Sequence, residues 1–420
     1  MKHVVVHPAI GGRRGGQPLC LIVLLVLLFG GLARSGSAQP GFTVALGRAF
    51  NSVSDPAAPG ATDSRQTTVA TFEVEHLAAA ERLRLFYTLD AGNYTTPGDW
   101  QYYLHTAGAT WGVPVGSAKQ HILYLSGSGS FRSNGASWAA ADYRAAGLMA
   151  NAELHPAPVV TVRLGYRLDV RDFPDLGEMD QVQHDGFGSV LIALPTRTTL
   201  ISEAHLGTKR YADTFGMPAS FQTAEMPAAP PGSGLMGRGV GPGLRGGSAA
   251  PSLQENRAGM VTWLARVAQS LTDRTGVSFQ YAARTTFGRV SPVLVTTPAL
   301  YFDDRVYDDP FASGARVISV AAKRVFAGGM ELEAQASRSV KDYNAVVALD
   351  ADGSGLPALE LRADRIWRAS AGWTVPIARS KSGPLALDLS IDYLFTRHRS
   401  NDAFYNYTTH TIGLGAKVSY

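Results

Sequence analysis

The sequence has few charged residues and almost no cysteine. Asp, Glu, Lys and Arg make up 17% of the 420 residues, whereas an ordinary soluble domain has about 25%. The only cysteine is Cys20, so the chain cannot form an internal disulfide. Long apolar runs are also missing, because after residue 39 none approaches the roughly 18–20 residues that a membrane-spanning helix needs. These absences exclude a disulfide scaffold and a bundle of membrane helices.

A basic surface is missing too, once the first 38 residues are set apart. The chain holds 38 basic and 34 acidic residues. The first 38 positions contain no Asp or Glu but four basic residues, which are Lys2, Arg13, Arg14 and Arg34. Removing these four from the 38 leaves 34 basic residues, equal to the 34 acidic ones. A nucleic-acid-binding domain carries a basic patch, so we expect no nucleic-acid partner.

Residues 1–38 have the pattern of a secretory signal peptide. Basic residues precede an apolar run of 11 residues at positions 19–29, and small residues follow at positions 35–38. Cleavage near Ala38 would remove Cys20 and leave a mature chain of residues 39–420. We therefore expect an exported protein that consists of one domain without disulfides.

The mature chain alternates apolar and polar residues with a period of two, which is typical of β-strands with one apolar face. Between positions 161 and 171, one face holds Val162, Leu164, Tyr166, Leu168 and Val170. Residues 82–91 and 385–396 repeat the pattern. Sixteen segments are predicted as strands: 42–51, 67–78, 82–92, 102–112, 121–131, 139–154, 159–171, 184–194, 198–210, 258–270, 276–288, 313–325, 329–340, 358–375, 385–397 and 404–420.

The connections between these segments alternate between short ones and mostly longer ones rich in Gly, Pro and Asp. A soluble sandwich also alternates along its strands, so strand length, strand number and loop asymmetry decide between the two folds. Long loops at one rim and tight turns at the other are typical of outer-membrane barrels. Lipid offers no hydrogen bonds, and only helices or closed barrels satisfy their own backbone. The sequence therefore predicts an all-β fold, a closed antiparallel transmembrane β-barrel of about 16 strands (14–18), with short periplasmic turns and long external loops.

The last segment ends on an aromatic residue preceded by apolar residues at every second position: Leu414, Ala416, Val418 and Tyr420. This ending resembles the assembly signal of bacterial outer-membrane β-barrel proteins, and the whole mature chain resembles porin-like members of that class. No motif selects a particular subfamily. The resemblance implies an outer-membrane location, contact with membrane lipids and lipopolysaccharide, and recognition by the barrel assembly machinery. A homo-oligomer stays open.

Charged residues on the polar faces of the predicted strands would line the lumen. We expect a basic ladder formed by Arg82, Arg84, Arg163, Arg167 and Arg171. An acidic wall on roughly the opposite side would contain Glu331, Glu333, Glu360, Asp388 and Asp392. Opposed charges across a narrow channel create a field that orients polar solutes. The alternative is that these charges pair with one another and stiffen the wall.

Two external segments attract attention for different reasons. Residues 211–258 are rich in Gly and Pro, which predicts a long flexible loop. Four carboxylates cluster between positions 303 and 309, and they belong to Asp303, Asp304, Asp308 and Asp309. Clustered oxygens suit Ca²⁺, although the spacing matches no defined calcium loop. Apart from this possible ion, we expect no cofactor.

Catalysis is not expected. A hydrolase needs a nucleophile beside a positioned base, and the sequence contains neither G-x-S-x-G nor H-E-x-x-H. Ser133 begins a short resemblance to an outer-membrane phospholipase motif, but the histidine required just before the serine is absent. The prediction is a porin-like channel through which small polar or anionic solutes diffuse. The alternative is a non-conducting barrel that serves adhesion, envelope structure or exopolysaccharide export.

Overall fold

The computed structural model describes residues 40–54, 62–77, 82–94, 101–116, 120–211, 257–288, 309–348, 350, 360–379 and 386–419. These residues form sixteen β-strands, all of which were predicted from the period-two pattern. The strands are β1 (Pro40–Ser54), β2 (Thr62–Leu77), β3 (Arg82–Tyr94), β4 (Gln101–Val115), β5 (His121–Asn134), β6 (Tyr143–Ala157), β7 (Val160–Asp172), β8 (Gln181–Ala193), β9 (Thr198–Tyr211), β10 (Arg257–Thr272), β11 (Thr275–Gly288), β12 (Ser313–Val325), β13 (Glu331–Val347), β14 (Leu361–Arg379), β15 (Ala386–Ser400) and β16 (Tyr407–Ser419).

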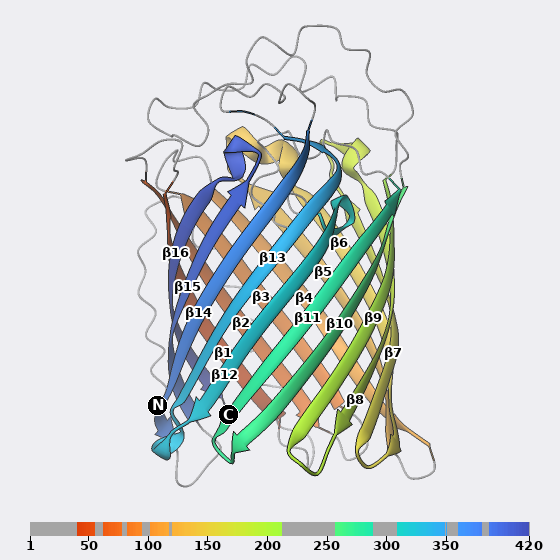
Figure 1. The fold of residues 1–420 in the computed structure, drawn as a ribbon, viewed down its shortest axis with the longest axis vertical. Coiled ribbons are helices and arrows are strands. Elements are labelled where there is room, and N and C mark those ends of the chain that lie inside the picture. The colour runs from red at the N-terminus through yellow and green to blue at the C-terminus, as the bar shows by residue number, and fades with distance from the viewer. Residues whose placement is uncertain are drawn as a thin grey trace, which may run out of the picture.

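Each strand pairs antiparallel with the next along the chain, and the first pairs with the last. The closing pair runs from Thr43 opposite Ser419 to Ser54 opposite Thr408. The result is a closed barrel of tilted strands (Figure 1). Closure leaves no free sheet edge. The predicted fold class is therefore confirmed, and a two-layer sandwich is excluded.

The two ends of the barrel differ in the length of their connections. At the end where β1 begins and β16 ends, the connections between strands are two to six residues long, whereas at the other end they reach 45 residues between β9 and β10. We call these the turn end and the loop end. Short 3-10 turns lie at the loop end, namely η1 (Ala136–Ala141), η2 (Gly177–Met179), η5 (Pro310–Ala312) and η7 (Ala403–Tyr405), and η6 (Ala327–Gly329) lies at the turn end.

Helices contribute little to the described part of the chain. Among these residues, no helix is long and apolar enough to cross a membrane.

A cluster of buried side chains shows which face of the wall points inward. Tyr143 of β6, Tyr211 of β9, Met260 of β10 and Tyr343 of β13 belong to one cluster. These strands are spread around the ring, so their side chains can meet only in the interior. Because side chains alternate along a strand, the inner and outer faces of these strands follow, and cross-strand register extends the assignment to their neighbours.

The outer face is apolar and exposed. Leu164, Leu206 and Ile391 are 53%, 57% and 59% exposed, which is unusual for large apolar side chains in a folded protein. Every strand from β3 to β16 except β13 contributes at least one exposed large apolar or aromatic residue. An apolar exterior that extends over this many described strands marks a surface that is covered in its working environment.

Candidate functional site

The lumen is the candidate functional site, because sixteen strands enclose more space than the side chains of the wall can fill. Because alternate residues of a strand point to opposite faces of the wall, the residues that line the lumen can be identified on each strand. On β7, Arg163, Arg167 and Arg171 face inward, whereas Leu164 and Tyr166 face outward. The inner face is thus charged where the outer face is apolar.

Two arginines of the predicted basic ladder lie in ion pairs on the lumen wall. Nε of Arg163 lies 2.8 Å from Oε2 of Glu153 on β6, and the Arg163 side chain is 53% exposed. Nε of Arg167 lies 2.6 Å from Oδ2 of Asp169 on its own strand, and its Nη2 donates to Oδ1 at 2.9 Å. Both cations remain accessible from the lumen, but each has a carboxylate beside it.

The third arginine of β7 has a different environment. Arg171 is buried at the loop end, with its guanidinium 4.5 Å from the centre of the Tyr143 ring. It therefore contributes to packing at the mouth of the barrel. Arg82 and Arg84 of β3 also face the lumen, since Arg82 lies opposite the inward-facing Gly112 of β4. The side chains of Arg82 and Arg84 are both exposed.

The acidic residues of β15 lie across the lumen from β7, because the two strands are separated by eight positions in a ring of sixteen. Asp388 lies opposite Lys417 of β16, which places a cation beside it. Asp392 lies between Gly372 of β14 and Gly413 of β16. A Cβ added to Gly372 would lie 2.7 Å from Oδ1 of Asp392, so the absence of a side chain there leaves room for this exposed carboxylate.

The remaining members of the predicted acidic wall divide into two groups. Glu331 and Glu333 face inward on β13, and Oε2 of Glu331 lies 2.6 Å from Nζ of Lys323. Glu360 was expected on a strand, but β14 begins at Leu361. Its carboxylate therefore belongs to the segment before β14 at the loop end rather than to the strand wall. The prediction placed the start of this strand three residues too early.

A buried ion pair fixes the η5 turn inside the loop end. Nζ of Lys209 lies 2.7 Å from Oδ2 of Asp309, and both side chains are 4% exposed. The hydroxyl of Tyr211 donates to the same carboxylate at 2.9 Å, and the backbone N–H of Phe311 donates to Oδ1 at 3.0 Å. Phe311 is fully buried and belongs to the same interior cluster as Met260. The segment after residue 308 thus lies against the inner wall of β9 and β10.

A second buried network lies on β13 to β15. Arg362 donates to both carboxylate oxygens of Asp364, at 3.0 and 2.6 Å. Nε2 of His398 lies 2.9 Å from Oδ2 of Asp364, and the Tyr343 hydroxyl donates to the same oxygen at 3.2 Å. The guanidinium of Arg362 also lies over the rings of Tyr343 and Tyr405. Polar groups buried in this way need such mutual partners.

These two networks give the lumen two regions. Toward the loop end, aromatic and paired charged side chains are buried against one another. Toward the turn end and the middle of the strands, Arg163, Arg167 and Asp392 are exposed. The arrangement combines a charge-lined interior with side chains packed against one another at the loop end.

The acidic cluster expected to hold Ca²⁺ is only partly described. Asp303, Asp304 and Asp308 lie outside the described residues. Asp309 is described, and its carboxylate accepts from Lys209 and Tyr211. Among the described residues, no group of three or more His, Cys, Asp or Glu side chains is arranged to hold a metal ion.

The sequence-based analysis did not find a triad of Asp, Glu and His side chains on β8 and β9. Nδ1 of His205 lies 2.9 Å from Oδ1 of Asp185, and its Nε2 lies 2.7 Å from Oε1 of Glu203. All three face the lumen in the register of these strands. Their alternation with outward residues such as Leu206 could have predicted from the sequence that they face the lumen, and the same holds for Glu153.

Other residues singled out in the sequence have defined positions. Ser133 of β5 belongs to the outer face, because it shares this face with the exposed Leu125 and Phe131. Leu414, Ala416 and Val418 of the expected assembly signal share the outer face of β16. Tyr420 lies outside the described residues, as do residues 1–38 and 212–256 of the expected signal peptide and long loop.

No family model and no curated protein matches the chain. Among solved structures it is similar to OpdL of Pseudomonas aeruginosa, with 10% identity over 91% of this chain and 98% of that one, and a TM-score of 0.45. It is also similar to OccK2 (OpdF) of Pseudomonas aeruginosa in complex with glucuronate, with 9% identity over 90% and 98% and a TM-score of 0.46. A bacterial polysaccharide outer membrane secretin matches with 9% identity over 90% and 97% and a TM-score of 0.46.

Proposed function

We propose that the chain is an outer-membrane channel through which small polar solutes, anionic ones in particular, diffuse along a charge-lined lumen. The observation that carries this proposal is the opposition of the two faces of one closed wall. The outer face exposes large apolar side chains, while the inner face of the same strands exposes charges. The apolar outer face suits contact with lipid, and the charged inner face suits contact with water.

The length of the strands supports a transmembrane position. The strands contain 13 to 19 residues, and about 9–11 tilted residues suffice to cross the hydrocarbon core. The wall therefore extends beyond the lipid, and we place the loop end outside the cell and the turn end in the periplasm, as is usual for such barrels.

Selectivity for anions is the finer part of the proposal. Arg163 and Arg167 on β7 lie across the lumen from Asp388 and Asp392 on β15. A solute between these walls meets a transverse field. Its anionic groups would be drawn to the exposed guanidinium groups, whose charge the adjacent carboxylates only partly offset.

Planar-bilayer recording tests both parts. The purified protein should produce discrete conductance steps. Replacing Arg163 and Arg167 by Ala leaves Glu153 and Asp169 without their cations, so we expect the anion-to-cation permeability ratio to fall by about twofold or more. The matched control is the double variant Arg144→Ala/Arg324→Ala, which removes two arginines of the outer face. An unchanged ratio in the β7 variant would contradict the selectivity, and the absence of conductance would contradict the channel.

The interior cluster at the loop end favours a second candidate, a barrel that does not conduct. The cluster joins side chains from β6, β9, β10 and β13, and it narrows the mouth. If the protein and all its variants insert into the bilayer but none conducts, this alternative is supported. The loops would then act in adhesion, envelope structure or polysaccharide export.

A further inference from the structure

Five arginines lie close together on the outer face of the barrel near its loop end. We call them the arginine row: Arg316, Arg338, Arg365, Arg397 and Arg399. They belong to the adjacent strands β12 to β15, and all five are exposed. On β14 and β15, Arg365, Arg397 and Arg399 alternate with buried residues of the inner face such as Asp364 and His398. On β12 and β13, Arg316 and Arg338 occupy the face opposite to the buried Ser319 and Ser339, so all five arginines point away from the lumen.

The register of the strands brings these arginines together. Arg365 lies directly opposite Arg399, and Arg397 lies opposite Trp367. Arg338 lies opposite Trp367 from the other side, with its guanidinium 5.0 Å from the centre of the indole ring. Trp367, which is 49% exposed, is thus flanked by two cations.

The arginine row lies at the border of the apolar outer surface. At the next outward position toward the turn end, β12 presents Ile318 and β15 presents Phe395, and Val320 and Tyr393 follow them. Tryptophan and arginine are both favoured where hydrocarbon meets the polar headgroups. The row therefore has the height of the outer-leaflet headgroups if the barrel spans the membrane as proposed.

Among the described residues of β12 to β15, no ion pair balances the charge of the arginine row. Like charges directly opposite each other destabilise a sheet, yet Arg365 faces Arg399. In the described part of β12 to β15, Asp342 is the one carboxylate at an outward position, and none of the five arginines forms an ion pair with an acidic side chain there. By contrast, the outward Arg144 of β6 lies opposite Asp172 of β7.

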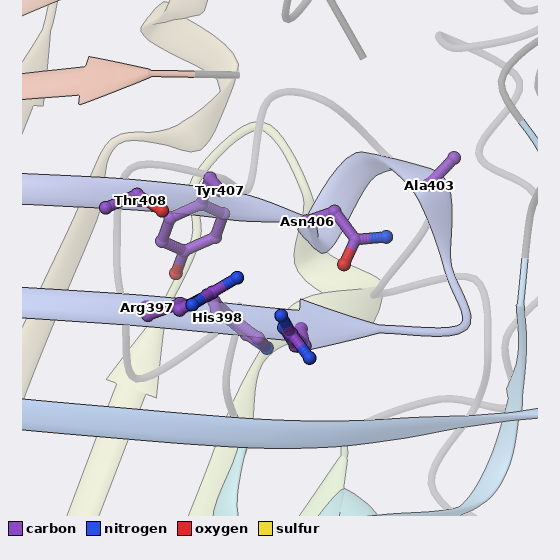
Figure 2. Close-up of a pocket in the computed structure, with 7 residues that line it drawn as sticks. Arg397, His398, Ala403, Asn406, Tyr407 and Thr408 are labelled. Carbon is purple, nitrogen blue, oxygen red and sulfur yellow. The ribbon is translucent and has the colours of Figure 1, made fainter. Parts of the chain in front are cut away.

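A hollow adjoins the row at the hairpin between β15 and β16. It has a volume of about 470 Å³ and is lined by Arg397, His398, Arg399, Ala403, Asn406, Tyr407 and Thr408. Figure 2 shows Arg397 and His398 coming from one strand, Tyr407 and Thr408 from the other, and Asn406 from the turn between them. This volume is in the range of ligand-binding pockets.

We propose that the arginine row binds the phosphate groups of a phosphorylated glycolipid of the outer leaflet, whose acyl chains lie against the apolar wall below. Guanidinium groups bind phosphate oxygens in a bidentate manner, and basic clusters at the membrane surface recognise anionic headgroups. A bound phosphate would also remove the repulsion between Arg365 and Arg399. This inference rests on the proposed outer-membrane position, and it adds a specific lipid site to it.

Native mass spectrometry of the detergent-purified barrel tests the proposal with lipid A that carries two phosphates, with the same lipid after dephosphorylation, and with inorganic phosphate. We expect retention of phosphorylated lipid A, with at least about tenfold weaker retention of the dephosphorylated lipid. The variant Arg365→Ala/Arg397→Ala/Arg399→Ala should lose retention to a similar extent. Millimolar inorganic phosphate should not displace the lipid, because it lacks the acyl chains.

A matched control removes another opposed pair of outward arginines at the loop end, Arg210 of β9 and Arg257 of β10. The variant Arg210→Ala/Arg257→Ala should retain the lipid, because this pair has no flanking arginines on further strands. Equal retention of both lipid forms, displacement by phosphate alone, or equal loss in both variants would overturn the proposal. The conductance of the same variants in planar bilayers tests the channel independently of the lipid site. Because the arginine row does not face the lumen, loss of lipid binding should leave the conductance unchanged.

Discussion

Three tyrosine–histidine pairs recur on the outer face, each joining neighbouring strands. In each pair the tyrosine hydroxyl lies within hydrogen-bond distance of Nδ1 of the imidazole. The pairs are Tyr87 with His105, Tyr166 with His184, and Tyr393 with His410. They occupy diagonal positions, since Phe395 rather than Tyr393 is directly opposite His410, and diagonal neighbours are within reach of aromatic side chains. In each pair, the tyrosine hydroxyl gives the imidazole Nδ1 a hydrogen-bond partner on an otherwise apolar surface.

The pair on β15 and β16 gives a prediction at this scale. The hydroxyl of Tyr393 lies 2.8 Å from Nδ1 of His410. Tyr393→Phe leaves the imidazole without this partner among apolar groups, and we expect the free energy of unfolding in lipid vesicles to fall by about 1–3 kcal/mol. The double variant Tyr393→Phe/His410→Leu should recover most of the loss, because no polar atom is left unpaired. Equal destabilisation in the single and double variants would contradict the hydrogen-bond account.

The faces of individual residues were predictable from the sequence, but their partners were not. A period of two places Arg163 and Arg167 on the polar face of one strand. Whether Glu153 lies beside Arg163 depends on the register between β6 and β7, and a shift of one residue would exchange the faces. The burial of Arg171 against Tyr143 likewise depends on how the connections at the loop end fold.

At the scale of elements, the short η5 turn determines how far the loop end is narrowed. It is attached through Asp309 to Lys209, which is 100 positions away in the sequence. No local pattern predicts a contact over this separation. The sixteen strands, in contrast, were predictable because each one carries its own alternation, and most predicted boundaries differ from the observed ones by a few residues.

The attachment of η5 can be tested by conductance. In the variant Asp309→Ala, the buried Lys209 would lose the carboxylate of Asp309, and breaking a buried ion pair costs about 3–5 kcal/mol. We therefore expect the turn to leave its position and the single-channel conductance to rise.

The control replaces both partners with apolar residues. The variant Lys209→Met/Asp309→Leu leaves no buried charge and should keep the conductance close to that of the unmodified protein. If Asp309→Ala changes neither the conductance nor the protease sensitivity of the loop end, then the ion pair does not hold the turn in place.

At the scale of the whole molecule, composition and topology agree. Outside the first 38 residues, basic and acidic residues are equal in number, and the low share of charged residues reflects a wall that is charged on one face only. Closure of the ring by β1 and β16 satisfies the backbone of every strand. What the molecule admits depends on the balance between exposed charges in the middle of the lumen and packed side chains at its mouth.

The orientation of the two faces is the claim on which the channel and the lipid site both depend. The only cysteine is Cys20, in the expected signal peptide, so single cysteines can be introduced along β7 and labelled with a fluorophore in lipid vesicles. We predict that labels at positions 164, 166, 168 and 170 are quenched by brominated lipids, and that labels at 163, 165, 167 and 169 are quenched by aqueous iodide. A reversed pattern, or quenching without alternation, would contradict the account.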